Sequence, residues 1–487
     1  MSNVAFLLNK RQIPLLLKTY IICIFLFVTT LFIIRMIRKD IYICHEDEMI
    51  YYNSAKLFYE TNSLKAGFCI NENRSSVGEF NWYGPGYALI YGGVAKMFGF
   101  TNYFFVAFHY ALFILCLFLI WKFPFNKIKR LLFLAVFLST YASFSYVFTY
   151  FPEELNLFFS LLLLLLYAKI KTNKNILICY IIVIFIFSLV RVSFIFWIFT
   201  IFFIKDSPLK RIFSVILSLL FLFFILVYIK LFNAPAFVQG LKEIYGSSND
   251  TGFVSAIIKI TKNGLMNGIA LYENTSSSVF CIVILLIIAV FSVLTIKQCD
   301  LSNWGLVLLL LLVCVVFLLL YVFIPMYIEK QLLFFIPVCI YLIIRNKKYI
   351  SLLLFFSIFL FAPYSLLKTK KFIDDSKKFY YSYQSEQKDR NYCSSIFNNV
   401  SIHKNEINVL FQYQDFNLTY LPVSIHGIPI LYTTNVLAYN YSDSLRYKRF
   451  NKISIDYILA KHRTLLPNYR LIKNPGYYFL YEQISHK

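Results

Sequence analysis

Apolar stretches close to the length of a membrane span recur through this chain of 487 residues and limit what it can fold into. A helix needs about 20 apolar residues to cross the hydrocarbon core of a bilayer. Charged residues make up only 15% of the chain, whereas a soluble domain carries about 25%. We therefore expect a protein that crosses the membrane many times. The candidate spans are residues 13–37, 102–121, 131–150, 153–170, 212–232, 279–296, 302–324, 331–344 and 349–367.

The apolar interval 175–204 carries Arg191 in its middle and needs separate treatment. As one straight helix it would be about 45 Å long, at 1.5 Å per residue, against a hydrocarbon core of about 30 Å. It is therefore either one strongly tilted helix or two short helices that turn near Arg191. Two helices keep the neighbouring Lys/Arg clusters in cytoplasmic loops, which gives eleven crossings with the N-terminus inside.

The net charge of +23 does not indicate a nucleic-acid partner, because the basic residues form short clusters between apolar runs. The ten cysteines are scattered without a Cys-x-x-Cys pair, so neither a zinc site nor a disulfide scaffold is expected. Cys44 and Cys69 could pair outside the cytoplasm, and the sequence leaves this open.

The topology with eleven crossings places three polar segments on the outer side of the membrane: residues 38–101, 233–278 and 368–487. The predicted fold is an all-α, multi-spanning membrane module over residues 1–367, followed by a small α/β domain over 368–487. Within that tail, residues 407–411 and 477–481 read as strands.

The first outer segment contains two motifs. Asp47 and Glu48 lie in an acidic run directly after the first span, in a chain that has only 24 acidic residues. Further on, Gly84-Pro85-Gly86-Tyr87 opens an apolar helix that ends at Phe98-Gly99. This helix is too short to cross a bilayer and suits the membrane interface.

These motifs resemble those of the C-type (GT-C) glycosyltransferase superfamily, and within it the branch of protein mannosyltransferases and aminoarabinose transferases. That branch has an Asp-Glu-x-x-Tyr motif after its first span, matched by Asp47-Glu48-Met49-Ile50-Tyr51. It also has a Pro-Pro-x-Tyr segment that opens an interfacial helix, matched from Gly84 to Tyr87 with the first proline replaced.

Later positions follow the same order. Glu153 and Glu154 stand where the family has its second acidic residue, and Arg191 where it has a basic residue facing the lipid phosphate. Residues 329–337 resemble the family's Glu-Arg-Tyr-Leu-Leu-x-x-x-Pro segment, with Lys330 in place of arginine. Lysine keeps the charge but loses the bidentate fork of arginine. The resemblance covers residues 1 to about 367.

The resemblance implies roles for these residues. Asp47 would be the general base, with Glu48 as its partner or as a ligand for the acceptor or a cation. Arg191 and Lys330 would bind the donor phosphate. Glu153, Glu154, Tyr51 and Tyr87 would form a second acidic or acceptor site.

Each role has a simpler alternative. Glu153 and Glu154 could be an ordinary polar helix start, and the acidic run at Asp47 and Glu48 a solvated loop end. Arg191 could be a paired structural arginine, and Lys330 an interface anchor. The resemblance implies no catalytic metal, although carboxylates could hold Mg²⁺ or Mn²⁺.

The expected function is an integral membrane glycosyltransferase at the outer face of the cytoplasmic membrane. It would move a sugar from a polyprenyl-phosphate donor to an envelope acceptor, namely a polysaccharide such as the O-antigen of lipopolysaccharide, a lipid or a protein. One alternative is a transporter or flippase of lipid-linked sugars, which predicts internal repeats and mid-bilayer charges. Another is a polysaccharide polymerase or ligase, which would favour Arg/His sites in outer loops.

Overall fold

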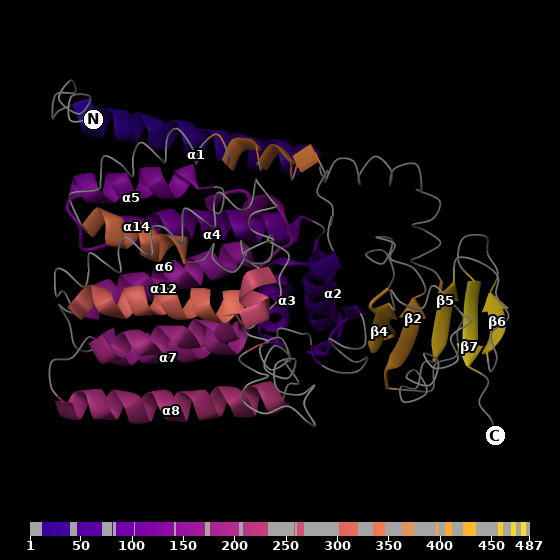
Figure 1. Cartoon of the computed structure of the whole chain (residues 1–487). Coiled ribbons are helices and arrows are strands. Elements are labelled where there is room, and N and C mark those ends of the chain that lie inside the picture. The colour runs from indigo at the N-terminus through magenta and orange to yellow at the C-terminus, as the bar shows by residue number, and fades with distance from the viewer. Residues whose placement is uncertain are drawn as a thin grey trace.

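The computed structural model shows mostly helices and a small sheet at one end of them (Figure 1). The described residues are 12–38, 46–70, 80, 84–101, 103–140, 143–170, 176–203, 208–231, 258, 261–266, 301–319, 335–345, 363, 365–367, 369–371, 373–374, 396–397, 405–411, 422–434, 456–460, 469–473 and 479–483. The expected span 279–296 lies outside these residues, and so do most of 349–367 and of the outer segment 233–278.

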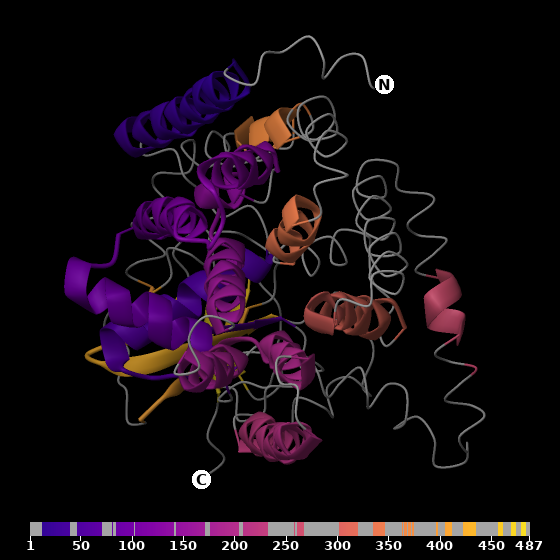
Figure 2. The same ribbon diagram turned by 90° about the vertical axis from the view of Figure 1, so that its left-hand side faces the viewer.

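The helices that lie side by side form a bundle, and Figure 2 looks along it. They are α1 (Gln12–Arg38), α4 (Phe104–Trp121), α5 (Lys127–Ser139), α6 (Glu153–Ile170), α7 (Ile176–Val190), α8 (Pro208–Leu231), α12 (Leu301–Leu319) and α14 (Ile336–Arg345). Two described helices, Pro14–Arg38 and Phe104–Trp121, are long and apolar enough to cross a membrane. Several others are apolar but shorter, so the number of crossings stays a prediction.

Large apolar side chains cover the outer surfaces of α1 and α8. Leu15 and Ile37 on α1 and Leu219 and Phe223 on α8 are all more than half exposed, from 61% to 75%. In water such a surface would be unfavourable, whereas lipid tails would cover it without cost. The outward faces of α1 and α8 are therefore apolar rather than polar.

The interval around Arg191 is a pair of short helices. α7 ends at Val190, and a 3₁₀-helix, η3 (Val192–Phe203), begins after Arg191. The Tyr180 and Thr200 hydroxyls lie 2.7 Å apart although 20 residues separate them, whereas a straight α-helix would hold them about 30 Å apart. The turn expected at Arg191 is thus confirmed. The 3₁₀ rise of about 2.0 Å per residue lets the 12 residues of η3 reach about as far as α7.

Two short helices, α2 (Glu46–Thr61) and α3 (Gly86–Phe98), lie across one end of the bundle (Figure 1). Their close packing depends on glycines. A Cβ on Gly86 would lie 2.6 Å from the Val190 Cα, and a Cβ on Gly92 would lie 2.7 Å from the Ala55 carbonyl oxygen. The Gly-Pro-Gly-Tyr motif therefore brings the start of α3 against the end of α7.

Beyond α2 lies a sheet of seven strands among the described residues, in the order β1-β4-β2-β5-β7-β6, with β3 paired to β4. β1, β4, β2 and β5 run parallel to one another, whereas β3 is antiparallel to β4 and β7 is antiparallel to both β5 and β6. The strands are β1 (Phe68–Ile70), β2 (Ile407–Phe411), β3 (Ser424–Ile425), β4 (Ile428–Thr434), β5 (Tyr457–Ala460), β6 (Tyr469–Lys473) and β7 (Phe479–Gln483).

The strand predicted at 407–411 is confirmed as β2, and the run at 477–481 overlaps β7, which begins at Phe479. β1 was not predicted. It comes from the predicted outer segment 38–101 and pairs with β4, with Phe68 opposite Tyr432. The tail therefore does not build its sheet alone.

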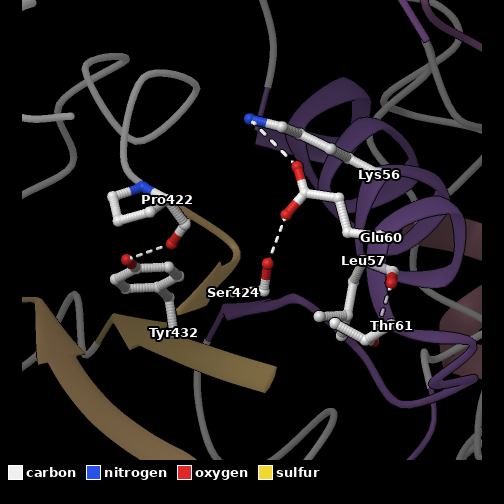
Figure 3. A network of polar contacts seen from close by, with 7 residues as sticks. All are labelled: Lys56, Leu57, Glu60, Thr61, Pro422, Ser424 and Tyr432. Carbon is white, nitrogen blue, oxygen red and sulfur yellow. Dashed lines mark hydrogen bonds and ion pairs between the residues drawn. The ribbon is translucent and has the colours of Figure 1, made fainter. Parts of the chain in front are cut away.

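α2 joins the bundle to the sheet. Its Leu57 is fully buried in a cluster with Val423 and Leu431 of the sheet region. The Ser424 hydroxyl donates to Glu60 Oε2 at 2.6 Å, and Lys56 Nζ lies 4.0 Å from Glu60 Oε1 (Figure 3). Residues of α2 and of the tail are thus packed together.

Candidate functional site

Three segments that are distant in sequence meet where α2 and α3 cross the bundle: the start of α2, the start of α6 and the turn at Arg191. The Tyr150 main-chain N–H donates to Glu48 Oε1 at 2.9 Å, across 102 residues. Three residues later, Glu153 begins α6, and its Oε1 lies 3.9 Å from Arg191 Nη1. The acidic motif after the first span and the buried arginine therefore share one end of the bundle.

Glu48 is the third residue of α2, and only 2% of its surface is exposed. A carboxylate in the first turn interacts favourably with the helix dipole. Its bond to the Tyr150 N–H also ties this turn to the segment that leads into α6. Asp47 precedes it, so the Asp47 backbone lies in the same anchored turn, while its side chain is outside what the structure describes.

Arg191 lies between two helices rather than inside one. Its N–H donates to the Phe187 carbonyl, and its own carbonyl accepts from the Phe194 N–H. The residue is 6% exposed, and a buried guanidinium requires a charged partner. Glu153 supplies one. At 3.9 Å the contact is longer than a charge-assisted hydrogen bond of about 2.8 Å, so it is mainly electrostatic.

Two tyrosines from the predicted motifs lie beside this pair. The Tyr87 hydroxyl donates to Asn156 Oδ1 at 2.8 Å, and the Tyr51 ring meets the Tyr87 ring edge-on, with centroids 5.3 Å apart. Burial raises the pKa of Tyr87, and the neighbouring Arg191 opposes this shift. The phenol is therefore neutral at physiological pH and acts as a donor.

Glu154 is fully buried, and neither of its carboxyl oxygens has a hydrogen-bond partner among the described residues. Burying a carboxyl group without a partner is unfavourable, so stability alone does not explain an acid at this position. The structure separates the two neighbouring acids, because the contact with Arg191 comes from Glu153.

Some predicted site residues cannot be placed. Lys330 and Cys44 fall outside the described residues, so the second phosphate contact and the disulfide both stay open. Within the part of the chain that the structure describes, no group of three or more His, Cys, Asp or Glu side chains could hold a metal ion.

Two residues of this region were not predicted from the sequence. Asn156 follows Glu153 by three positions on α6, which places both on one helix face. A lone asparagine in an apolar helix was the sequence signal that could have identified it. His109 on α4 contacts the Tyr91 hydroxyl of α3 through Nε2 at 2.8 Å. This contact holds α3 against the bundle one turn beyond Tyr87.

The arrangement combines carboxylates, a buried cation and phenol donors at one end of the helices. Such groups can bind an anion and accept a proton close to each other. Comparison of the chain with protein-family models, curated proteins and solved structures finds no match.

Proposed function

We propose that this protein is an integral membrane glycosyltransferase that uses a polyprenyl-phosphate sugar. The acceptor is a component of the cell envelope, namely a polysaccharide such as O-antigen, a lipid or a protein. The proposal includes eleven crossings of the cytoplasmic membrane, with the start of α2 and the sheet on its outer side.

The observation that carries the proposal is the meeting of Glu48, Glu153 and Arg191 at one end of the bundle. Glu48 reaches the Tyr150 N–H at 2.9 Å, and Arg191 lies 3.9 Å from Glu153. A sugar-phosphate donor requires a cation for the departing phosphate and a base for the acceptor hydroxyl. Asp47, the proposed base, directly precedes Glu48 on the first turn of α2, so the base and the cation Arg191 both come from this end of the bundle, which supports both functions in one site.

The surface of the protein supports a lipid-linked donor. α3 lies across the end of the bundle, and Leu89, Met97 and Phe98 on it are exposed, by 52% to 77%. A short helix with exposed apolar residues suits the boundary between headgroups and acyl chains. A polyprenyl chain confines its sugar to the same depth.

The proposed reaction is a direct displacement. The Asp47 carboxylate takes the proton of the acceptor hydroxyl, and the acceptor oxygen forms a bond to the anomeric carbon. The bond from that carbon to the phosphate oxygen breaks, and the polyprenyl phosphate leaves against Arg191, with Lys330 as a second contact. Because the base and the leaving group are on opposite sides, the anomeric configuration inverts.

The test is a transfer assay in membranes that contain wild type or Asp47→Asn. The donors are undecaprenyl-phosphate glucose, galactose and mannose with a radiolabelled sugar. We expect wild type to move label into envelope material and Asp47→Asn to lose about 10²–10⁴-fold in rate. The proposal fails if the variant keeps full activity. Label that crosses vesicle membranes while still lipid-linked would instead identify a flippase.

A further inference from the structure

We propose that Glu48 is a positioning residue, which holds the Asp47-bearing turn of α2 at a fixed place relative to Arg191, and that it takes no proton itself. This inference rests on the proposed sugar transfer. It assigns different roles to two neighbouring acids that the sequence pattern cannot tell apart.

The contact that carries the inference joins segments far apart in the chain. Glu48 Oε1 accepts from the Tyr150 main-chain N–H at 2.9 Å, and the side chain is 2% exposed. A general base must come within about 3 Å of the acceptor hydroxyl. A buried carboxylate that already binds the main chain is poorly placed for that task.

The same contact sets the position of Asp47. The Asp47 and Glu48 Cα atoms are about 3.8 Å apart, so the Asp47 backbone follows the Glu48 anchor. On the other side, Tyr150 precedes Glu153 by three residues, and Glu153 pairs with Arg191. A short path of bonds and contacts therefore links the proposed base to the proposed phosphate ligand.

The remainder of α2 is held by other contacts. Gly92 of α3 packs against Ala55, and Glu60 accepts from Ser424 of the sheet. These contacts secure the middle and the end of the helix. The Glu48 bond joins the first turn of α2 to the segment before α6.

Two conservative substitutions separate positioning from proton transfer. Glu48→Gln keeps a carbonyl oxygen at the same reach but removes the charge. Glu48→Asp keeps the charge but shortens the side chain by about 1.5 Å, which breaks the bond unless α2 moves. If Glu48 acts by positioning, the Gln variant should therefore keep more activity than the Asp variant. If Glu48 accepts a proton, the Asp variant should keep more activity.

The assay measures kcat and donor KM with undecaprenyl-phosphate glucose, galactose or mannose, whichever wild type uses. We expect Glu48→Gln to keep at least about a fifth of the wild-type kcat. We expect Glu48→Asp to lose about 10–100-fold in kcat, with donor KM within about twofold because Arg191 is unchanged. The matched control is Glu60→Asp, which shortens the other anchoring carboxylate of α2 and should leave kcat unchanged.

The inference is overturned if Glu48→Gln is as inactive as Asp47→Asn while Glu48→Asp stays active. A result in which wild type is inactive, or Asp47→Asn is active, instead removes the proposed function. Hydrogen exchange of wild type gives a readout that needs no variant to fold. The Tyr150 amide should be protected, and rapid exchange there would contradict the anchor.

Discussion

Arg191 Nη1 lies 3.9 Å from Glu153 Oε1, so the turn between α7 and η3 faces the first residue of α6. Both side chains are almost completely buried, by 93% or more. Removing one partner of a buried ion pair leaves the other charge uncompensated. This pair therefore links the stability of the bundle end to the proposed phosphate site.

Glu153→Gln should lower the free energy of unfolding by about 3 kcal/mol, because the Arg191 charge stays buried without its counter-charge. The measurement is the thermal unfolding midpoint of the purified protein in detergent. The control is Glu482→Gln, which breaks an ion pair with Arg470 that is 70% exposed on the arginine side. Exposed pairs contribute little, so equal shifts in the two variants would contradict the buried pairing.

Gly86→Ala should disturb the site through the backbone alone. The added Cβ would lie 2.6 Å from the Val190 Cα, so α3 has to move away from the Arg191 turn. We expect lower thermal stability and at least a tenfold loss of transfer. Gly93→Ala is the control on the same helix, because nothing lies within 4 Å of its Cβ position. If both variants behave alike, the close packing of α3 on α7 is wrong.

Leu57→Ala should loosen the sheet from α2. Leu57 is fully buried against Val423 and Leu431, and such truncations cost about 2–5 kcal/mol. Limited proteolysis should then cut between the bundle and the sheet sooner than in wild type. Leu89→Ala removes the same atoms from a side chain that is 52% exposed and serves as the control. Unchanged proteolysis of Leu57→Ala would show that α2 does not hold the sheet.

Tyr87→Phe should reduce transfer about 5–50-fold, because it removes the bond to Asn156 beside Arg191. Burial raises the pKa of Tyr87 above its usual value of 10.0. The phenol therefore keeps its proton throughout the physiological range, and it titrates only at still higher pH. The ratio of wild-type to variant rates should be constant from about pH 6 to pH 9. A ratio that changes within this range would mean that Tyr87 loses its proton there.

The sequence predicted the features that depend on local charge and hydropathy. Arg191 interrupts an apolar run, and Glu153 begins one, so the turn and the helix start were both predictable. Residues 407–411 form β2 because an apolar run between polar segments favours a buried strand.

The rest depends on contacts between distant segments, which no local pattern encodes. β1 has only three residues and pairs with a strand more than 360 positions later. The Glu48 contact uses the Tyr150 main-chain N–H, which is the same in every residue but proline. The 3₁₀ geometry of η3 could not be predicted from the sequence either, because its apolar residues would also suit an α-helix.

The most direct test of the account is the donor dependence of transfer in Asp47→Asn and Arg191→Gln, with exposed Arg470→Gln as the control. If the base and the phosphate ligand act on one bound donor, Asp47→Asn lowers kcat and leaves donor KM within about twofold. Arg191→Gln should raise donor KM about tenfold or more, which corresponds to at least about 1.4 kcal/mol of lost binding. If kcat and donor KM in both variants equal the wild-type values, the result would contradict a shared site at this end of the bundle.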